Sequence, residues 1–250
     1  MQDKLTPRQS RAWGLCALSV PAAMALAGRG WLWVLAGSAA ASGIVLFLQT
    51  LQRRSGQSLL EQMARAFGRR GGQIVGAAVC LWLLLAASGA AAASQIAFED
   101  DLGPLAPAVP LLLAALAGRK GQAAAARVSG VLALCLALLY SIIALASLRH
   151  VQAAWCRPWG SAADAGLSLC LCLTPACLLF LDGPGQTPRP GWSALAAAVL
   201  PGVAALLCSA CLSPAWTAQL PQPLYTLTKS LSVLSLSLIH ISEPTRLALI

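Results

Sequence analysis

Long runs without charged residues dominate this sequence, and they constrain the fold more than any single motif does. Residues 128–148, for example, contain no Asp, Glu, Lys or Arg and are rich in Leu, Ala and Ile. A helix needs roughly 20 apolar residues to cross the hydrocarbon core of a bilayer. Because lipid cannot hydrogen-bond to a free backbone, such runs cross it as helices. We therefore expect an all-α, multi-pass integral membrane protein with spans at about 13–28, 31–52, 73–97, 102–118, 128–148, 164–181 and 191–212.

The composition agrees with a membrane protein and argues against other classes. Of the 250 residues, 58% are hydrophobic and 10% are charged, whereas soluble domains average about 25% charged residues. The net charge is +9, but the basic residues are spread over the loops, so we expect no nucleic-acid partner. Most of the nine Cys lie inside apolar runs, where they act as small hydrophobic side chains rather than as a disulfide framework.

The loop charges predict an orientation in the lipid bilayer. If the N-terminus is cytoplasmic, twelve Lys and Arg residues fall in inner loops and three in outer loops. The inner set is Lys4, Arg8, Arg11, Arg53, Arg54, Arg65, Arg69, Arg70, Arg119, Lys120, Arg127 and Arg189, and the outer set is Arg29, Arg149 and Arg157. Cytoplasmic loops of membrane proteins carry the excess of positive charge. We therefore expect a cytoplasmic N-terminus.

Chemically reactive groups are rare in the predicted spans. Up to residue 235, every Asp and Glu and the single His150 lie in a loop or at the end of a span. No nucleophile–base pair or cluster of metal ligands is visible, so we expect no catalytic residue, no cofactor and no metal site. Cys208 and Cys211 have the spacing of a redox or metal motif, but no second such pair lies near them. We therefore interpret them, like Cys170, Cys172 and Cys177, as small side chains at helix contacts.

The predicted inner loop between the second and third spans contains a short amphipathic helix. Residues 58–70 read SLLEQMARAFGRR, with Ser58 followed three positions later by Glu61 and with apolar residues at helical spacing. This pattern indicates a capping box at the start of a helix. The helix either lies on the anionic inner leaflet or contacts a partner, or it is a connector with the usual inner positive charge.

Two predicted spans are interrupted by proline. Pro21 lies in the middle of the first span, and Thr174 and Pro175 lie in the middle of the sixth. A proline inside a span frees backbone groups that another partner must satisfy. Broken helices at matching positions of two halves indicate a binding site of the transporter type, although ordinary proline kinks give the same pattern. In the third span, Ser88 lies among small residues that allow close helix packing or line a cavity.

Four segments, in this order along the chain, resemble one known family. They are LTPRQ (residues 5–9), GRGWLWVLAG (28–37), RRSGQSLLEQMARAFGRRGGQIVG (53–76) and SPAWTAQLPQPLYTLTKSLSV (213–233). The set resembles the spore-germination permease family, the B subunits of nutrient germinant receptors. That family is part of the amino acid–polyamine–organocation superfamily. The resemblance extends over about residues 5–233, and it lies in the ordered set rather than in any one motif.

This resemblance implies a fold of ten helices in two inverted five-helix repeats. It implies that a small nutrient such as an amino acid binds where the first and sixth spans break. By position, Ser19, Pro21 and Ala22 fall in the first break, and Thr174 and Pro175 fall in the sixth. The resemblance also implies assembly with a larger membrane subunit and a lipoprotein in the inner membrane of a spore. Family members often carry an acidic residue in the sixth span, and none follows Thr174 here.

The last fifteen residues differ in character from the rest of the chain. LSLIHISEPTR, residues 236–246, resembles one translated frame of a transposon-end sequencing adapter. We therefore treat residues 236–250 as adapter-derived and residues 1–235 as the permease-like domain. On this interpretation the chain holds seven of the expected ten helices.

Three functions remain open from the sequence. The first is a membrane subunit of a germinant receptor, which binds a small nutrient and triggers spore germination. The second is a secondary amino-acid transporter of the same fold. The third is a membrane scaffold without a small ligand. The two interrupted spans favour the first two.

Overall fold

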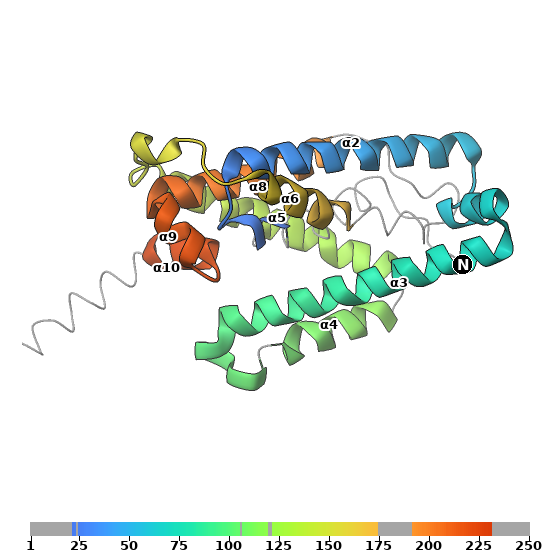
Figure 1. The fold of residues 1–250 in the computed structure, drawn as a ribbon. Coiled ribbons are helices and arrows are strands. Elements are labelled where there is room, and N and C mark those ends of the chain that lie inside the picture. The colour runs from blue at the N-terminus through green and yellow to red at the C-terminus, as the bar shows by residue number, and fades with distance from the viewer. Residues whose placement is uncertain (1–21, 24, 106, 120–121, 175–191, 232–250) are drawn as a thin grey trace, which may run out of the picture.

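The structure is a computed structural model, and it describes residues 22–231 apart from residues 24, 106, 120–121 and 175–191. The regular structure of these residues is entirely helical and includes no strand (Figure 1), which confirms the predicted all-α class for this part of the chain. The helices are α2 (Trp31–Ser55), α3 (Leu59–Leu102), η1 (Gly103–Leu105), α4 (Ala108–Arg119), α5 (Gln122–Ser147), η2 (Ala153–Cys156), α6 (Ala162–Leu173), α8 (Trp192–Leu212), α9 (Pro214–Gln219) and α10 (Pro223–Leu231).

Among the described residues, three helices are long and apolar enough to cross a membrane. They lie over Trp31–Gln52 in α2, Leu59–Gly89 in α3 and Arg127–Ser147 in α5. These helices support the prediction of a membrane protein. By contrast, α4 and α6 have 12 residues each, or about 18 Å of helix at 1.5 Å per residue. Neither helix alone matches a hydrocarbon core of about 30 Å.

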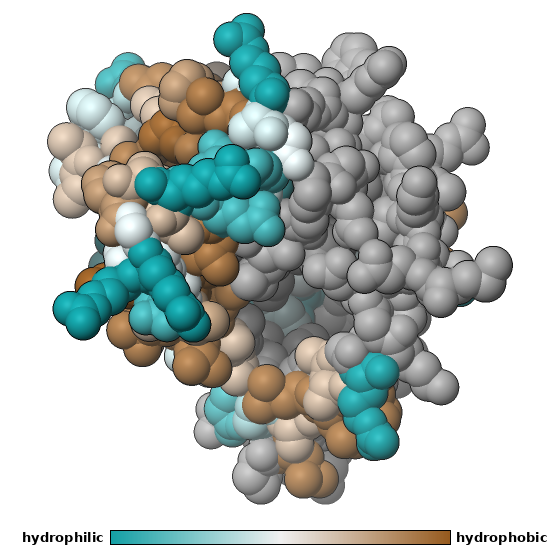
Figure 2. Space-filling view, turned by 90° about the vertical axis from the view of Figure 1, so that its right-hand side faces the viewer, coloured by the Kyte–Doolittle hydropathy of each residue, from teal (hydrophilic) through white to brown (hydrophobic). Residues whose placement is uncertain are grey.

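The helix α3 joins two segments that the sequence predicts as separate helices. Its start has the predicted capping box, because the Ser58 N–H donates to Glu61 Oε2 at 3.3 Å and the Glu61 N–H donates to Ser58 Oγ at 3.2 Å. The helix bends at Gly68, whose φ of 75° favours glycine, and it continues as the predicted third span. Figure 2 shows this end of the molecule, where hydrophilic side chains gather around the α2–α3 connection.

The far end of α3 differs from the predicted boundary. The sequence predicts a loop at residues 98–101 and a span over 102–118, but α3 runs to Leu102 and the chain turns at Gly103, where φ is 54°. The next α-helix, α4, begins at Ala108, after Pro104 and Pro107. Proline has no N–H and disfavours helix in the residue before it, which delays the start of α4.

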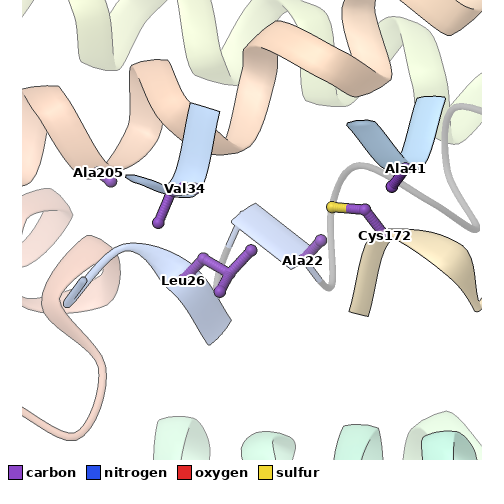
Figure 3. Close-up of a cluster of buried hydrophobic side chains, with 6 residues drawn as sticks. All are labelled: Ala22, Leu26, Val34, Ala41, Cys172 and Ala205. Atoms are coloured by element: carbon purple, nitrogen blue, oxygen red, sulfur yellow. The ribbon is translucent and has the colours of Figure 1, made fainter. Parts of the chain in front are cut away.

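The helix α2 lies between α6 and α8, and small residues allow these helices to approach closely. Val34 and Ala41 of α2 are buried in one cluster with Cys172 of α6 and Ala205 of α8 (Figure 3). Replacing Gly37 by a residue with a Cβ would bring that atom into collision with the carbonyl oxygen of Ala165 in α6. Such packing through small residues is typical of helices that associate in membranes.

Two serine hydroxyls tie α2 to its neighbours. Ser168 of α6 is fully buried, and its Oγ donates to the Val34 carbonyl at 2.8 Å. Ser38 of α2 is also buried, and its Oγ donates to the Ala198 carbonyl of α8. That carbonyl lies three residues before Pro201, which is inside α8 and cannot donate to the helix. The carbonyl that loses its helical donor is that of Ala197, four residues before Pro201, so Ser38 bonds to the carbonyl next to it.

A second cluster joins the C-terminal helices to the body of the fold. Leu224 and Leu227 of α10 are buried with Cys208 of α8, Ile143 of α5 and Ala27. The apolar face of α10 is thus covered by the protein itself.

Two long helices carry large exposed apolar surfaces. In α3, the side chains of Leu81, Leu84 and Leu85 are exposed. In α5, Leu134, Leu138, Ile142 and Leu145 are exposed in the same way. Soluble monomers rarely show such continuous apolar patches. Lipid is the solvent that these surfaces match.

Candidate functional site

The short segment before α2 meets the end of α6, and this contact builds the candidate site. Ala22 and Leu26 are buried, and they share one cluster with Cys172 in the last turn of α6 (Figure 3). Ala22 directly follows the proline that interrupts the first predicted span, and Cys172 lies two residues before Thr174. Two segments about 150 residues apart in sequence are therefore neighbours in the fold.

The end of α6 is held by a contact from α3. The helix ends at Leu173, and the N–H of Thr174 donates to the Leu171 carbonyl at 3.2 Å. Thr174 keeps helical dihedral angles, with φ of −47° and ψ of −39°, although it precedes Pro175. The Thr174 hydroxyl accepts a hydrogen bond from the indole N–H of Trp82 at 3.1 Å. This bond links the third predicted span to the interruption in the sixth.

Trp82 is a site residue that the sequence analysis did not single out. Its side chain is 39% exposed and lies on α3, far in sequence from Thr174. One signal could have found it. Most of the other Trp residues lie at or beyond the ends of predicted spans, as interfacial indoles do, whereas Trp82 lies well inside one.

The remaining predicted residues are not all brought together. Ser88 lies on α3 and is exposed, and its hydroxyl donates within the helix to the Leu85 carbonyl at 2.8 Å. The hydrogen bond of the Ser88 hydroxyl thus stays within α3 and does not join it to Thr174. Ser19, Pro21 and Pro175 lie outside the described residues.

An ion pair and two glycines join the same two segments at the other end of α6. The Asp164 carboxylate, in the first turn of α6, accepts from the Ser161 N–H at 3.1 Å and from the Gly30 N–H at 3.4 Å. Its second oxygen lies 3.6 Å from the Arg29 guanidinium. Gly160 has a φ of 92°, and a Cβ there would lie 2.8 Å from the Gly30 Cα. The chain just before α2 is thus held at both ends of α6.

The chemistry of the candidate site is that of neutral polar groups and backbone carbonyls. The last turn of an α-helix leaves carbonyls without intrahelical partners and carries a partial negative charge. Thr174 adds a hydroxyl and Trp82 an indole at this point. No group of three or more His, Cys, Asp or Glu side chains able to hold a metal occurs in the part of the chain that the structure describes.

The Cys208–Cys211 pair belongs to a different buried cluster from Ala22 and Cys172. Both thiols are free. Cys208 is fully buried among apolar side chains, and the Cys211 thiol donates to the Ser147 carbonyl of α5 at 3.7 Å. These contacts fit small side chains between α8 and its neighbours.

Comparison of the chain with protein-family models, with curated proteins and with solved structures finds no match.

Proposed function

We propose that this chain is the nutrient-binding, permease-like membrane subunit of a germinant receptor. The observation that carries the proposal is the cluster in which Ala22 and Cys172 are buried together. It makes neighbours of two segments that adjoin prolines, and Thr174 lies beside them with its hydroxyl bound to Trp82. Interrupted helices of this kind form the substrate sites of many transporters, because their free backbone groups can bind a ligand.

The proposed ligand is a small neutral amino acid. Its ammonium group would bind backbone carbonyls at the end of α6, where the helix dipole is negative. A hydroxyl and an indole are the polar side chains on the described part of the site, and neither carries a charge. No acidic residue follows Thr174 in the sixth predicted span, so the carbonyls would take the place of a carboxylate.

The wider assembly is also proposed. The resemblance of the ordered sequence segments implies a fold of ten helices in two inverted repeats. It also implies assembly with a larger membrane subunit and a lipoprotein in the inner membrane of a spore. A multi-pass topology with a cytoplasmic N-terminus follows from the loop charges. The arrangement of the helix ends supports it, since the starts of α2 and α6 adjoin at Gly30 and Gly160. The end of α8 adjoins the same region through η2: the Gln152 N–H donates to the Ala210 carbonyl at 3.0 Å, and the Trp31 indole N–H donates to the Cys156 carbonyl at 3.2 Å.

A secondary amino-acid transporter is the second candidate, because the same pair of interrupted segments would serve it. The two functions differ in the step after the amino acid binds. A transporter moves labelled amino acid across a sealed membrane, and a receptor subunit binds it without net uptake. Uptake by proteoliposomes that contain the protein separates the two.

The test of the site is amino-acid binding by a Thr174→Val variant. Valine keeps the shape of threonine and removes the hydroxyl. We expect binding to weaken about tenfold, which corresponds to the loss of one hydrogen bond of roughly 1–1.5 kcal/mol. The measurement is equilibrium binding of radiolabelled amino acids to the purified protein.

The matched control is Thr50→Val. The Thr50 hydroxyl donates only within α2, to the Phe47 carbonyl at 2.7 Å, and its side chain is exposed. This variant should bind like the parent protein. If both variants bind normally, or if no amino acid binds the parent, the proposed site is wrong.

A further inference from the structure

The turn between α2 and α3 presents a basic surface at one end of the molecule. The helix α2 closes at Gly56, which has a φ of 64°, and only two residues separate Gly56 from the start of α3 at Leu59. Exposed arginines lie on both sides of the turn: Arg54 on α2 and Arg65, Arg69 and Arg70 on α3. Figure 2 shows hydrophilic side chains gathered on this end beside apolar ones. We call these four arginines the basic surface.

Within the described part of the chain, no ion pair neutralises the basic surface. The ion pair found within the described residues joins Arg29 and Asp164, at the other end of the fold. The nearby acid in sequence is Glu61, and its carboxylate accepts from the Ser58 N–H in the capping box. Four guanidinium groups are therefore available to an external anion.

The first turns of α3 are anchored on one side and open on the other. Leu59 is buried and packs with Val45 and Leu48 of α2 and with Leu173 of α6. Further along α3, the side chains of Phe67 and Ile74 are each 70% exposed. An aromatic ring and an aliphatic side chain thus lie in water or lipid beside the arginines.

The contacts of Leu59 also indicate how deep the first turns of α3 lie in the bilayer. The apolar stretch of α2 ends at Gln52. At 1.5 Å per residue, Val45 lies about 10 Å before Gln52 along the helix and Leu48 lies about 6 Å before it. Amphipathic helices at a membrane surface bury their apolar face by about 5–10 Å. Leu59 therefore lies near the boundary of the hydrocarbon core, where the headgroups begin.

We propose that this end of the molecule binds the surface of a bilayer of anionic phospholipid. The arginines would bind the phosphate groups, for which the planar guanidinium has matching geometry, and Phe67 would lie among the lipid chains. A bilayer fits this surface better than an acidic protein does, because the surface lies where apolar membrane helices end. The inference rests on the membrane orientation proposed above.

The test uses a photoreactive residue in place of Phe67, p-benzoylphenylalanine, which keeps an aromatic side chain. The protein is reconstituted in vesicles of equal parts phosphatidylglycerol and phosphatidylcholine, irradiated, and analysed for lipid adducts by mass spectrometry. We expect phosphatidylglycerol adducts to exceed phosphatidylcholine adducts by about fivefold or more. About fivefold is the preference for an anionic surface that a single arginine contributes. In an Arg69→Gln/Arg70→Gln background, the preference should fall toward equality.

The matched control is an Arg149→Gln/Arg157→Gln background, which removes two exposed charges from the opposite end. It should keep the preference for the anionic lipid. Equal adducts with both lipids, a preference that survives loss of Arg69 and Arg70, or an adduct with protein in place of lipid would each overturn the proposal. Amino-acid binding is measured separately, so failure of the nutrient site leaves this test unaffected.

Discussion

At the scale of single residues, Asp164 connects the start of α6 to the segment before α2. Its carboxylate bonds to the backbone of Ser161 and Gly30 and pairs with Arg29. We expect Asp164→Ala to lower the free energy of unfolding by about 1–2 kcal/mol, because the start of α6 loses its cap and a buried contact to Gly30. The melting temperature of the purified protein in detergent measures this loss.

Arg29→Gln is the control for the ion pair alone. The Arg29 side chain is 53% exposed, and an exposed ion pair contributes only about 0–1 kcal/mol. The Arg29 variant should therefore melt close to the parent. If Arg29→Gln and Asp164→Ala lower the melting temperature equally, the ion pair and not the backbone contacts of Asp164 stabilises this region.

At the scale of the helix, two glycines of α2 have opposite surroundings. A Cβ at Gly37 would collide with the Ala165 carbonyl of α6, whereas a Cβ at Gly43 would meet no atom within 4 Å. We expect Gly37→Ala to destabilise the protein by about 1–3 kcal/mol through overpacking. Gly43→Ala should be neutral or stabilising by up to about 1 kcal/mol, because alanine is the better helix former.

Thermal unfolding of both variants checks this pair. A lower melting temperature for Gly37→Ala alone supports the close packing of α2 against α6. Equal melting temperatures would mean that α2 and α6 do not approach as closely as the structure describes.

At the scale of the whole molecule, the two ends of α2 belong to different faces of the protein. Glu61 follows the end of α2, and Gln219 lies in α9, close to the residues before α2 (Figure 1). If α2 crosses a bilayer with the basic end inside, Glu61→Cys should react with a membrane-impermeant maleimide only in inside-out vesicles. Gln219→Cys should react only in intact cells.

The parent protein, with its native cysteines, gives the background for both measurements. Both side chains are exposed in the structure, so burial does not prevent reaction. Labelling of both positions from the same side would contradict a membrane-crossing α2, and labelling with the sides exchanged would reverse the predicted orientation.

Local features of this protein were predictable from the sequence because they depend on residues close together in the chain. The capping box needs only Ser58 and Glu61, three positions apart, and both bonds are present. The helical class itself follows from the long uncharged runs, since a membrane admits few alternatives.

Long-range contacts were decided by tertiary structure alone. The sequence does not distinguish Gly37 from Gly43, and it does not pair Trp82 with Thr174, which is 92 positions away. Nor does it show that Gly68 bends α3 without ending it, because glycine both breaks helices and tolerates bends. Hydrophobic pattern and turn chemistry determine which segments are helical. Which helices touch depends on how side chains of particular size fit together, and that fit exists only once the helices are packed.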